Sequence, residues 1–232
     1  SGPIAFAYLE EPPFCFRGDD GQPCGSDVEL FAAVMEAMGI HEFETRLTEF
    51  ADLLPGLADG RWTVTTPLFI SVERQGLVDF GHPVWALADG LLTRQADASR
   101  LTGYEAVAAD GRARLVVVAD QVQEKSGLAA GIPDQRVIRV ATQDEAVLMV
   151  KSGRADAYAS VAMAHRGFLT RHPDADLAVV AVAGASPAQG AFAFAKSSGD
   201  FRTRFDAALS RLLGRGWHRS MMIRHGFAPG DF

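Results

Sequence analysis

Long apolar runs and blocks of like charge are both missing from this chain. Its apolar stretches are far shorter than the roughly 18 residues that a membrane-spanning helix needs. The 232 residues include 22 lysines and arginines against 29 aspartates and glutamates, giving a formal charge of -7 with no basic cluster. Such a chain is poorly suited to bind nucleic acid or an anionic membrane surface. With 48% hydrophobic residues, we expect a soluble globular protein of one large or two small domains.

Cysteine is scarce, and the two residues present lie close together. Cys15 and Cys24 flank the segment FRGDDGQP, in which Asp-Asp-Gly is a turn signal between short strand-like pieces. A hairpin there predicts a disulfide that would contribute about 2 to 3 kcal/mol and persist only in an oxidising compartment. The alternative is a pair of reduced, half-buried thiols.

The sequence shows no metal-binding or cofactor motif. The cysteine spacing is too long for a CxxC site, and the histidines are scattered. We therefore expect neither a metal nor a cofactor. The chain opens in strand-like sequence, so we expect that any secretion signal has been removed or was never present. The six histidines are His41, His82, His165, His172, His218 and His225.

Helices and strands alternate in the first part of the chain. A strand over residues 4–9 precedes a helix that Ser26 and Glu29 are expected to cap reciprocally and Gly39 to end. Strand-like residues 43–50, a short helix over 52–58 and a strand over 62–69 follow. This β-α-β-α-β order is typical of a mostly parallel sheet.

A second α/β unit begins near residue 95. It has predicted strands at 115–119, 136–141, 155–160 and 177–182, and a helix capped by Thr142 with Glu145. The last strand, at 191–195, and two closing helices are too few for a sheet of their own, so we expect them to return to the first unit. The prediction is an α/β fold with two mostly parallel sheets, lobe 1 being 1–93 with 187–232 and lobe 2 being 94–186. Two such lobes joined by two crossings can hinge.

Arg74 is the first candidate binding residue. The segment WTVTTPLFISVERQGLVDF is an apolar strand that runs into Ser71, Glu73 and Arg74. Ligands of open α/β sheets collect at the carboxyl ends of the strands, where a guanidinium can hold a carboxylate by two hydrogen bonds. The alternative is a surface arginine paired with Glu73 or Asp79.

The order of several motifs resembles the family 3 solute-binding proteins of bacterial ABC importers. These motifs are EEPPFCF, DVELFAAVMEAMGI, LTEFADLLPGLADGRW, PLFISVERQGLVDFGHPVW, VVVADQVQ and VKSGRADAYAS. Within the family, the chain is most similar to ectoine-binding and hydroxyectoine-binding proteins. The features that carry this likeness are Glu11 with Phe14, LTEF ending in Phe50, Phe69 five residues before Arg74, DAYA and QGAFAF. The resemblance implies a two-lobed type II periplasmic-binding fold.

The resemblance also implies a ligand site. Arg74 and Ser71 would hold a carboxylate, three phenylalanines would form an aromatic box, and Glu11 would face the cationic end. Core packing is the alternative for the phenylalanines, and Trp85 either lines the site or packs the lobes. The second lobe would add Asp120, Gln121 and Ser160. The full set is Glu11, Phe14, Phe50, Pro67, Phe69, Ser71, Arg74, Asp120, Gln121 and Ser160.

One departure from the family favours a modified zwitterion. Family members that bind α-amino acids usually carry an aspartate for the α-ammonium after the GRxDA segment, whereas here Ser160 is followed by Val161. We expect a non-enzymatic, monomeric, periplasmic or extracellular protein, free or lipid-anchored, that delivers ectoine or 5-hydroxyectoine to an ABC permease. A polar or cationic amino acid is the alternative ligand. Two different functions also stay open, namely the sensory domain of a receptor and a cyclohexadienyl dehydratase-like enzyme with Glu11 as general acid.

Overall fold

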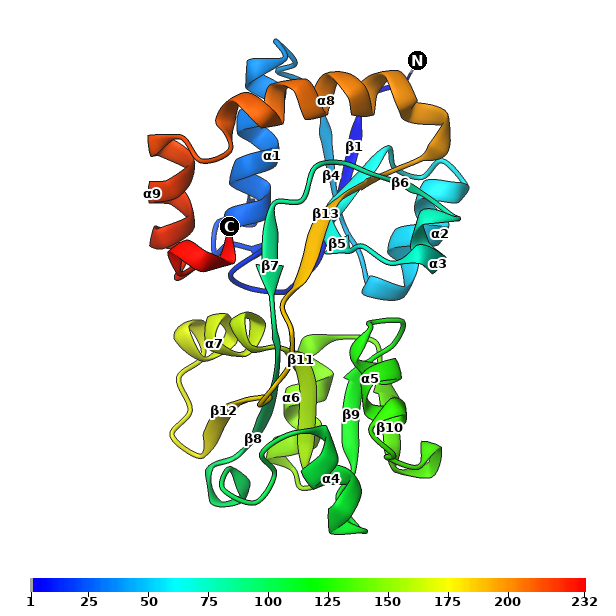
Figure 1. Ribbon diagram of the computed structural model, residues 1–232. Coiled ribbons are helices and arrows are strands. Elements are labelled where there is room, and N and C mark those ends of the chain that lie inside the picture. Colours follow the sequence, from blue (N-terminus) through cyan, green and yellow to red (C-terminus); the bar gives the residue numbers. More distant parts are fainter. Residues whose placement is uncertain (1) are drawn as a thin grey trace. The chain divides into compact units, whose positions relative to one another are not determined.

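The computed structural model describes residues 2–232 and divides them into two compact units (Figure 1). The first unit ends at Ala86 and resumes at Ala188, and the second is Leu87–Pro187. The predicted two-lobed α/β fold is confirmed. The first crossing precedes residue 93, because strand β8 (Asp89–Arg94) pairs antiparallel with β11 (Ala157–Val161) and β12 (Leu177–Ala181) of the second sheet.

The first unit is built on a six-stranded mixed sheet in the order β4-β1-β5-β13-β6, with β7 beside β13. Strands β4, β1 and β5 are parallel, as expected, while the returning strand β13 is antiparallel to β5 and β6. The strands are β1 (Ala5–Tyr8), β4 (Glu44–Leu47), β5 (Val64–Phe69), β6 (Asp79–Phe80), β7 (Trp85–Leu87) and β13 (Ala188–Phe194).

Helix α8 runs across one end of α1, and α9 lies beside α1 (Figure 1). Fully buried phenylalanines join these helices to the sheet: the ring centroids of Phe6 and Phe31 are 4.2 Å apart, and those of Phe192 and Phe205 are 5.2 Å apart. The helices are α1 (Ser26–Ala37), α2 (Leu53–Ala58), α3 (Val72–Gln75), α8 (Gly199–Leu212) and α9 (Gly216–Arg224), with 3₁₀ turns at Phe50–Asp52, Lys196–Ser198 and Pro229–Asp231.

The start of α1 differs from the predicted capping box. The helix follows Gly25 (φ 113°), and no side chain caps it. The Glu29 carboxylate instead pairs with Arg224, the last residue of α9, and with His225, which follows it. A Cβ at Gly25 would lie 2.4 Å from the Phe14 carbonyl oxygen, so this close approach requires glycine. The first turn of α1 is thereby fixed against the segment that carries Phe14.

The second unit has a five-stranded sheet in the order β10-β9-β11-β8-β12. Helix α4 packs on one face with Leu91, Leu115 and Ala157, and the ring of Tyr158 meets His165 of α7 on the other. The predicted box of Thr142 with Glu145 is confirmed. The remaining elements are β9 (Leu115–Val118), β10 (Val137–Val140), α4 (Tyr104–Asp110), α5 (Gln123–Ala129), α6 (Gln143–Lys151) and α7 (Ala162–Arg171), with 3₁₀ turns at Gln95–Asp97 and Asp134–Arg136.

The predicted disulfide is wrong: Cys15 and Cys24 are both free. The hairpin of β2 (Phe16–Arg17) and β3 (Pro23–Cys24) does form, but Cys24 is paired with Phe16. Cys15 precedes Phe16 by one residue, and successive side chains of a strand point to opposite faces. The side chains of Cys15 and Cys24 therefore do not face each other. Cys15 points inward, where its sulfur lies 3.4 Å from the Leu9 nitrogen and 3.6 Å from Thr66 Oγ1.

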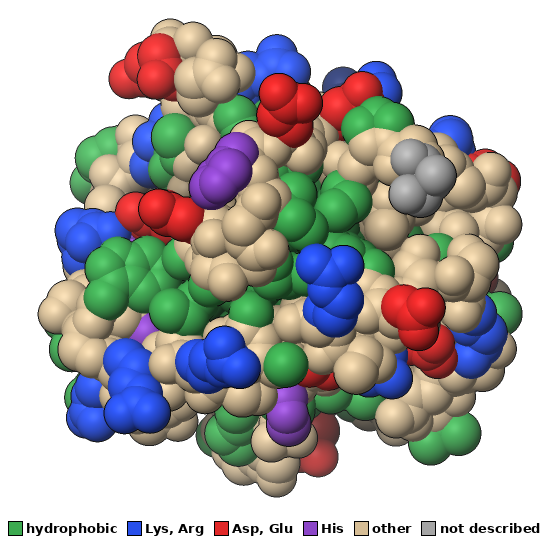
Figure 2. Space-filling view, turned by 90° about the horizontal axis from the view of Figure 1, so that it is seen from above, with side chains coloured by type: hydrophobic (Ala, Val, Ile, Leu, Met, Phe, Trp, Pro, Cys, Tyr) green, Lys and Arg blue, Asp and Glu red, His purple; other side chains and the backbone are tan. Residues whose placement is uncertain are grey.

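Surface charge agrees with the composition. In the view of Figure 2, acidic and basic side chains both lie on the surface, and several basic ones gather at the lower left. No helix formed by the described residues has the length and apolar character needed to cross a bilayer.

Candidate functional site

Most of the predicted residues of the first unit follow the carboxyl ends of three parallel strands. Phe50 comes after β4, Glu11 and Phe14 come after β1, and Ser71 and Arg74 come after β5. Because these strands are neighbours in the sheet, their ends share one edge. This is the edge at which open α/β sheets bind ligands.

Arg74 is buried, being only 7% exposed, so the alternative of a surface arginine is wrong. Ser71 begins α3, and its Oγ accepts the Arg74 backbone N–H at 3.2 Å. The guanidinium donates from Nη1 to the Phe69 carbonyl at 2.9 Å, and its Cζ lies 5.4 Å from the ring centroid of Phe50. Asp79, one of the two partners considered from sequence, pairs with Lys196. The backbone at the end of β5 therefore orients the arginine side chain.

Trp85 lies between two of the predicted aromatic residues. Its ring centroid is 5.6 Å from that of Phe14 and 5.3 Å from that of Phe69, the latter edge to face. A Cβ on Gly190 would lie 2.2 Å from the indole, so glycine is needed for the ring to rest on β13. Phe14 also packs on Phe227, with the two ring centroids 5.7 Å apart. The sequence left the role of Trp85 open, and the structure makes it the support of Phe14 and Phe69.

Glu11 is held by a tight turn. Its N–H donates to the Cys15 carbonyl at 2.7 Å, and its own carbonyl accepts the Phe14 N–H at 3.0 Å. Its negative charge contributes to raising the pKa values of Asp27 and Cys15. The Glu11 carboxylate therefore brings negative potential to this edge of the first unit.

Asp27 is a buried acid beneath these residues that the sequence did not single out. It is 3% exposed, and Thr66 Oγ1 donates to its Oδ2 at 2.7 Å. Burial raises the pKa of Asp27 to about 8, and the charge of Glu11 adds to this, against the lowering effect of Thr66 and the nearby Trp85 indole. The indole Nε1 itself makes no hydrogen bond of normal geometry. From sequence, Asp27 resembled any acidic residue in the first turn of a helix.

Pro67 interrupts the ladder between β5 and β13. The register of this antiparallel pair shifts between Ala191 and Ala193, opposite the part of β5 that contains Pro67. Proline has no N–H to donate to a neighbouring strand, which accounts for the bulge. Pro67 is buried in the interior of the strand, two residues before Phe69.

In the second unit, the predicted residues follow the ends of two parallel strands. Asp120 and Gln121 come after β9, and Ser160 lies near the end of β11. Asp120 has a positive φ of 68°, which aspartate tolerates better than most residues. Gln121 is 8% exposed and donates its N–H to the Val118 carbonyl at 3.2 Å, while Ser160 is 2% exposed.

A partly buried network near these residues was not predicted. The Asp89 carboxylate accepts the Tyr104 hydroxyl at 2.6 Å and the Gln123 side-chain amide at 2.9 Å. Burial and the Asp89 charge raise the pKa of Tyr104. The network fixes α4 and α5 to the start of β8. No sequence spacing signals it, because the three residues come from different elements.

Residues 2–232 contain no group of three or more histidine, cysteine, aspartate or glutamate side chains placed to hold a metal ion.

Comparisons with known proteins agree with this arrangement. A family model described as bacterial extracellular solute-binding proteins, family 3, matches residues 4–225. A probable amino-acid ABC transporter periplasmic-binding protein of Sinorhizobium fredii is 28% identical over 236 residues, covering 98% of this chain and 78% of the relative.

Two solved structures extend the comparison. EhuB in complex with hydroxyectoine has a TM-score of 0.90 and 27% identity, covering 98% of this chain and 89% of that one. An ancestral arginine-binding protein bound to glutamine has a TM-score of 0.86 and 21% identity, covering 97% and 98%. At 21% identity, the likeness to the arginine-binding protein shows the fold alone.

Proposed function

Because this chain belongs to family 3 of the bacterial extracellular solute-binding proteins, we propose that it captures a small zwitterion outside the cytoplasm and delivers it to an ABC permease. The observation that carries this proposal is the buried Arg74 at the carboxyl edge of the first sheet, with aromatic side chains nearby. Binding and release are sufficient for this role, and no catalytic step is proposed.

Arg74 is proposed to hold the carboxylate of the ligand. A guanidinium presents two parallel N–H groups that match a carboxylate, and it stays charged when buried. The Nη1 bond to the Phe69 carbonyl and the helix start at Ser71 hold the side chain before the ligand arrives. A preorganised donor loses less entropy on binding, so the charge-assisted pair contributes more to affinity.

The cationic end of the ligand is proposed to meet aromatic faces and Glu11. A cation over an aromatic ring gains about 0.5 to 2 kcal/mol, more where water is excluded. Phe50 lies beside Arg74, while Trp85 supports Phe14 and Phe69. Together with an arginine pair of about 1.5 to 3 kcal/mol, such contacts contribute a substantial share of the roughly 8 kcal/mol that a micromolar complex requires.

Ectoine and 5-hydroxyectoine are the ligands we favour. Each combines a carboxylate with a delocalised amidinium in one small ring, which suits an arginine opposite aromatic faces. The likeness to EhuB in complex with hydroxyectoine supports this choice. Val161, which follows Ser160, is apolar and 5% exposed, so it offers no carboxylate to an α-ammonium. Ser160, Gln121 and Asp120 are the proposed contributors from the second unit.

A polar or cationic amino acid is the second candidate. It is supported by the relative from Sinorhizobium fredii, described as a probable amino-acid ABC transporter periplasmic-binding protein. For such a ligand, Glu11 is the proposed partner of the α-ammonium.

Isothermal titration calorimetry with ectoine, 5-hydroxyectoine, arginine, glutamine and histidine tests both candidates. We expect micromolar binding of an ectoine and weaker or no binding of the amino acids. Arg74→Ala should weaken the ectoine complex by about 2 kcal/mol or more, roughly thirtyfold, because the ligand carboxylate would be left unpaired. Arg74→Lys should recover only part of the loss, because an ammonium lacks the planar pair of donors.

The matched control is Arg46→Ala on β4, which removes an exposed arginine that pairs with Glu44. It should leave the affinity unchanged. Absence of heat with both ectoines would reject them as ligands, and tight binding of one amino acid would establish the second candidate. Equal affinities for the wild type and Arg74→Ala would reject the proposed role of Arg74 for any ligand.

A further inference from the structure

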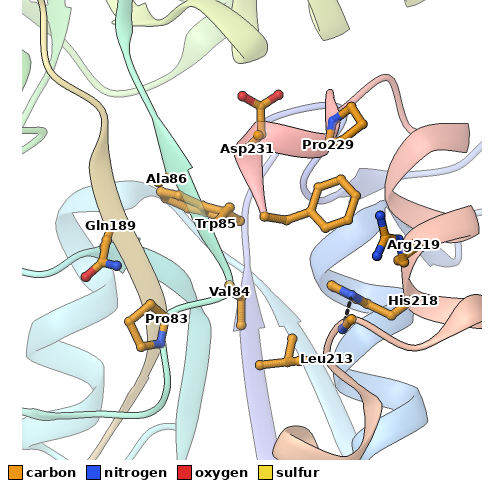
Figure 3. Close-up of a pocket in the computed structure, with 13 residues that line it drawn as sticks. Pro83, Val84, Trp85, Ala86, Gln189, Leu213, His218, Arg219, Pro229 and Asp231 are labelled. Atoms are coloured by element: carbon orange, nitrogen blue, oxygen red, sulfur yellow. Dashed lines mark hydrogen bonds between the residues drawn. The ribbon is translucent and has the colours of Figure 1, made fainter.

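The first unit contains a second recess, distinct from the Arg74 region, with a volume of about 330 Å³. It forms where the turn between α8 and α9 and the 3₁₀ turn at Pro229–Asp231 meet residues 83–86 and Gln189 (Figure 3). We call it the α9 pocket. Its volume is at the lower end of the range typical of small-molecule sites.

Apolar side chains form one part of the lining of the α9 pocket, and polar groups form the rest. Trp85, Leu213 and Phe232 contribute together with Pro83, Val84 and Pro229. Apolar walls favour an occupant with a hydrocarbon body, since its burial removes apolar surface from water.

His218 supplies a buried hydrogen-bond donor. The residue is 2% exposed, and its Nδ1 accepts the Gly214 N–H at 3.0 Å. A neutral imidazole that accepts at Nδ1 carries its proton on Nε2. Burial lowers the pKa of His218, which favours this neutral form. Nε2 is buried and has no hydrogen-bond partner among the described residues, and the ring extends from α9 toward Val84 and Leu213 (Figure 3).

Arg219, next to His218 in the first turn of α9, supplies a positive charge. Its side chain is exposed, and the described part of the chain provides no ion pair for it within 4.0 Å. Asp231, the acidic residue of the lining, directs its carboxylate away from His218 and Arg219 (Figure 3), and its Oδ2 accepts the Ala228 N–H at 2.8 Å. The polar side of the α9 pocket therefore offers donors and positive charge.

We propose that the α9 pocket is a second binding site, which takes a small monocarboxylate with an apolar body. The carboxylate would face Arg219 and would accept from His218 Nε2–H after a small opening of the lining that uncovers this buried atom. The hydrocarbon part would lie against Trp85 and Leu213. The first-turn amides of α9, which has no side-chain cap, add a favourable potential for an anion. The α9 pocket shares Trp85 with the aromatic residues near Arg74, but the proposal for this pocket does not require Arg74 to bind a ligand.

Benzoate and its neutral analogue benzamide test this site. Both are titrated into ¹⁵N-labelled Arg74→Ala protein and followed by ¹H–¹⁵N NMR, so that the proposed carboxylate partner elsewhere in the chain is absent. We expect benzoate to shift the amides of Gly214 and Arg219 and the Trp85 indole N–H in a saturable way, and benzamide to bind more weakly.

Two variants resolve the role of charge. Arg219→Gln should weaken benzoate binding about threefold to fivefold, as expected for loss of an exposed ion pair, and leave benzamide binding unchanged. The matched control is Arg215→Gln, which removes an exposed arginine just before α9 that does not line the pocket. Three results would each overturn the proposal: no saturable shift at the lining residues, benzamide binding as tight as benzoate, or equal losses in the two arginine variants.

Discussion

The buried carboxyl group of Asp27 makes folding stability depend on pH in an unusual direction. Its pKa is about 8 in the folded protein, against 3.8 as the ordinary value. Between these values the native state holds a proton that the unfolded chain releases. Stability from this group is therefore fully present below about pH 4 and is lost as the pH rises through 8. Most carboxylates that are paired in the native state act in the opposite direction.

Asp27→Asn removes this dependence with little change of shape. An amide is neutral at every pH, and its oxygen can still accept the hydrogen bond from Thr66. At about 1.4 kcal/mol per pH unit, the wild type should lose about 2.6 kcal/mol relative to the variant between pH 5 and pH 7. It should lose about 1.4 kcal/mol more by pH 9, where the titration is nearly complete.

The assay is urea unfolding of both proteins at pH 5, 6, 7, 8 and 9, followed by far-UV circular dichroism. The difference in unfolding free energy between the two proteins reports mainly on Asp27, since groups that its charge does not reach titrate equally in both. Asp200→Asn is the matched control, because Asp200 is also an acidic residue in the first turn of a helix but is exposed. The difference in unfolding free energy between Asp200→Asn and the wild type should be the same at every pH. If the difference between Asp27→Asn and the wild type were also independent of pH, Asp27 would not be held protonated by burial.

Three further outcomes follow from particular contacts. Gly190→Ala should lower the free energy of unfolding by about 1 to 3 kcal/mol and weaken ligand binding, because a Cβ there displaces the Trp85 ring; an unchanged indole NMR signal would contradict this. Asp120→Val should be about 1 to 2 kcal/mol less stable than Asp120→Gly in urea unfolding, because its φ is positive, and equal stabilities would disprove a strained position. Thiol titration of the unreduced, denatured chain should detect both Cys15 and Cys24, whereas no reaction would show that they had formed a disulfide.

Periodicity and capping signals predicted most of the fold. The alternation of apolar segments with helical stripes indicated two α/β units, and Thr142 with Glu145 begins α6 as expected. These features are local, since each depends on residues a few positions apart. The predicted capping box of Ser26 with Glu29 was wrong. The close approach of Gly25 to Phe14 fixes the start of α1, and Glu29 pairs with Arg224 of α9 instead.

The sequence by itself placed Arg74 just beyond the carboxyl end of a strand and so named it as a candidate, and the resemblance to family 3 solute-binding proteins added Glu11 and Phe50. Only the tertiary structure decided what surrounds them. The burial of Asp27, the position of Trp85 on Gly190 and the inward turn of Cys15 depend on contacts between segments far apart in the chain. Strand register and close packing set such contacts, and no spacing within one segment encodes them.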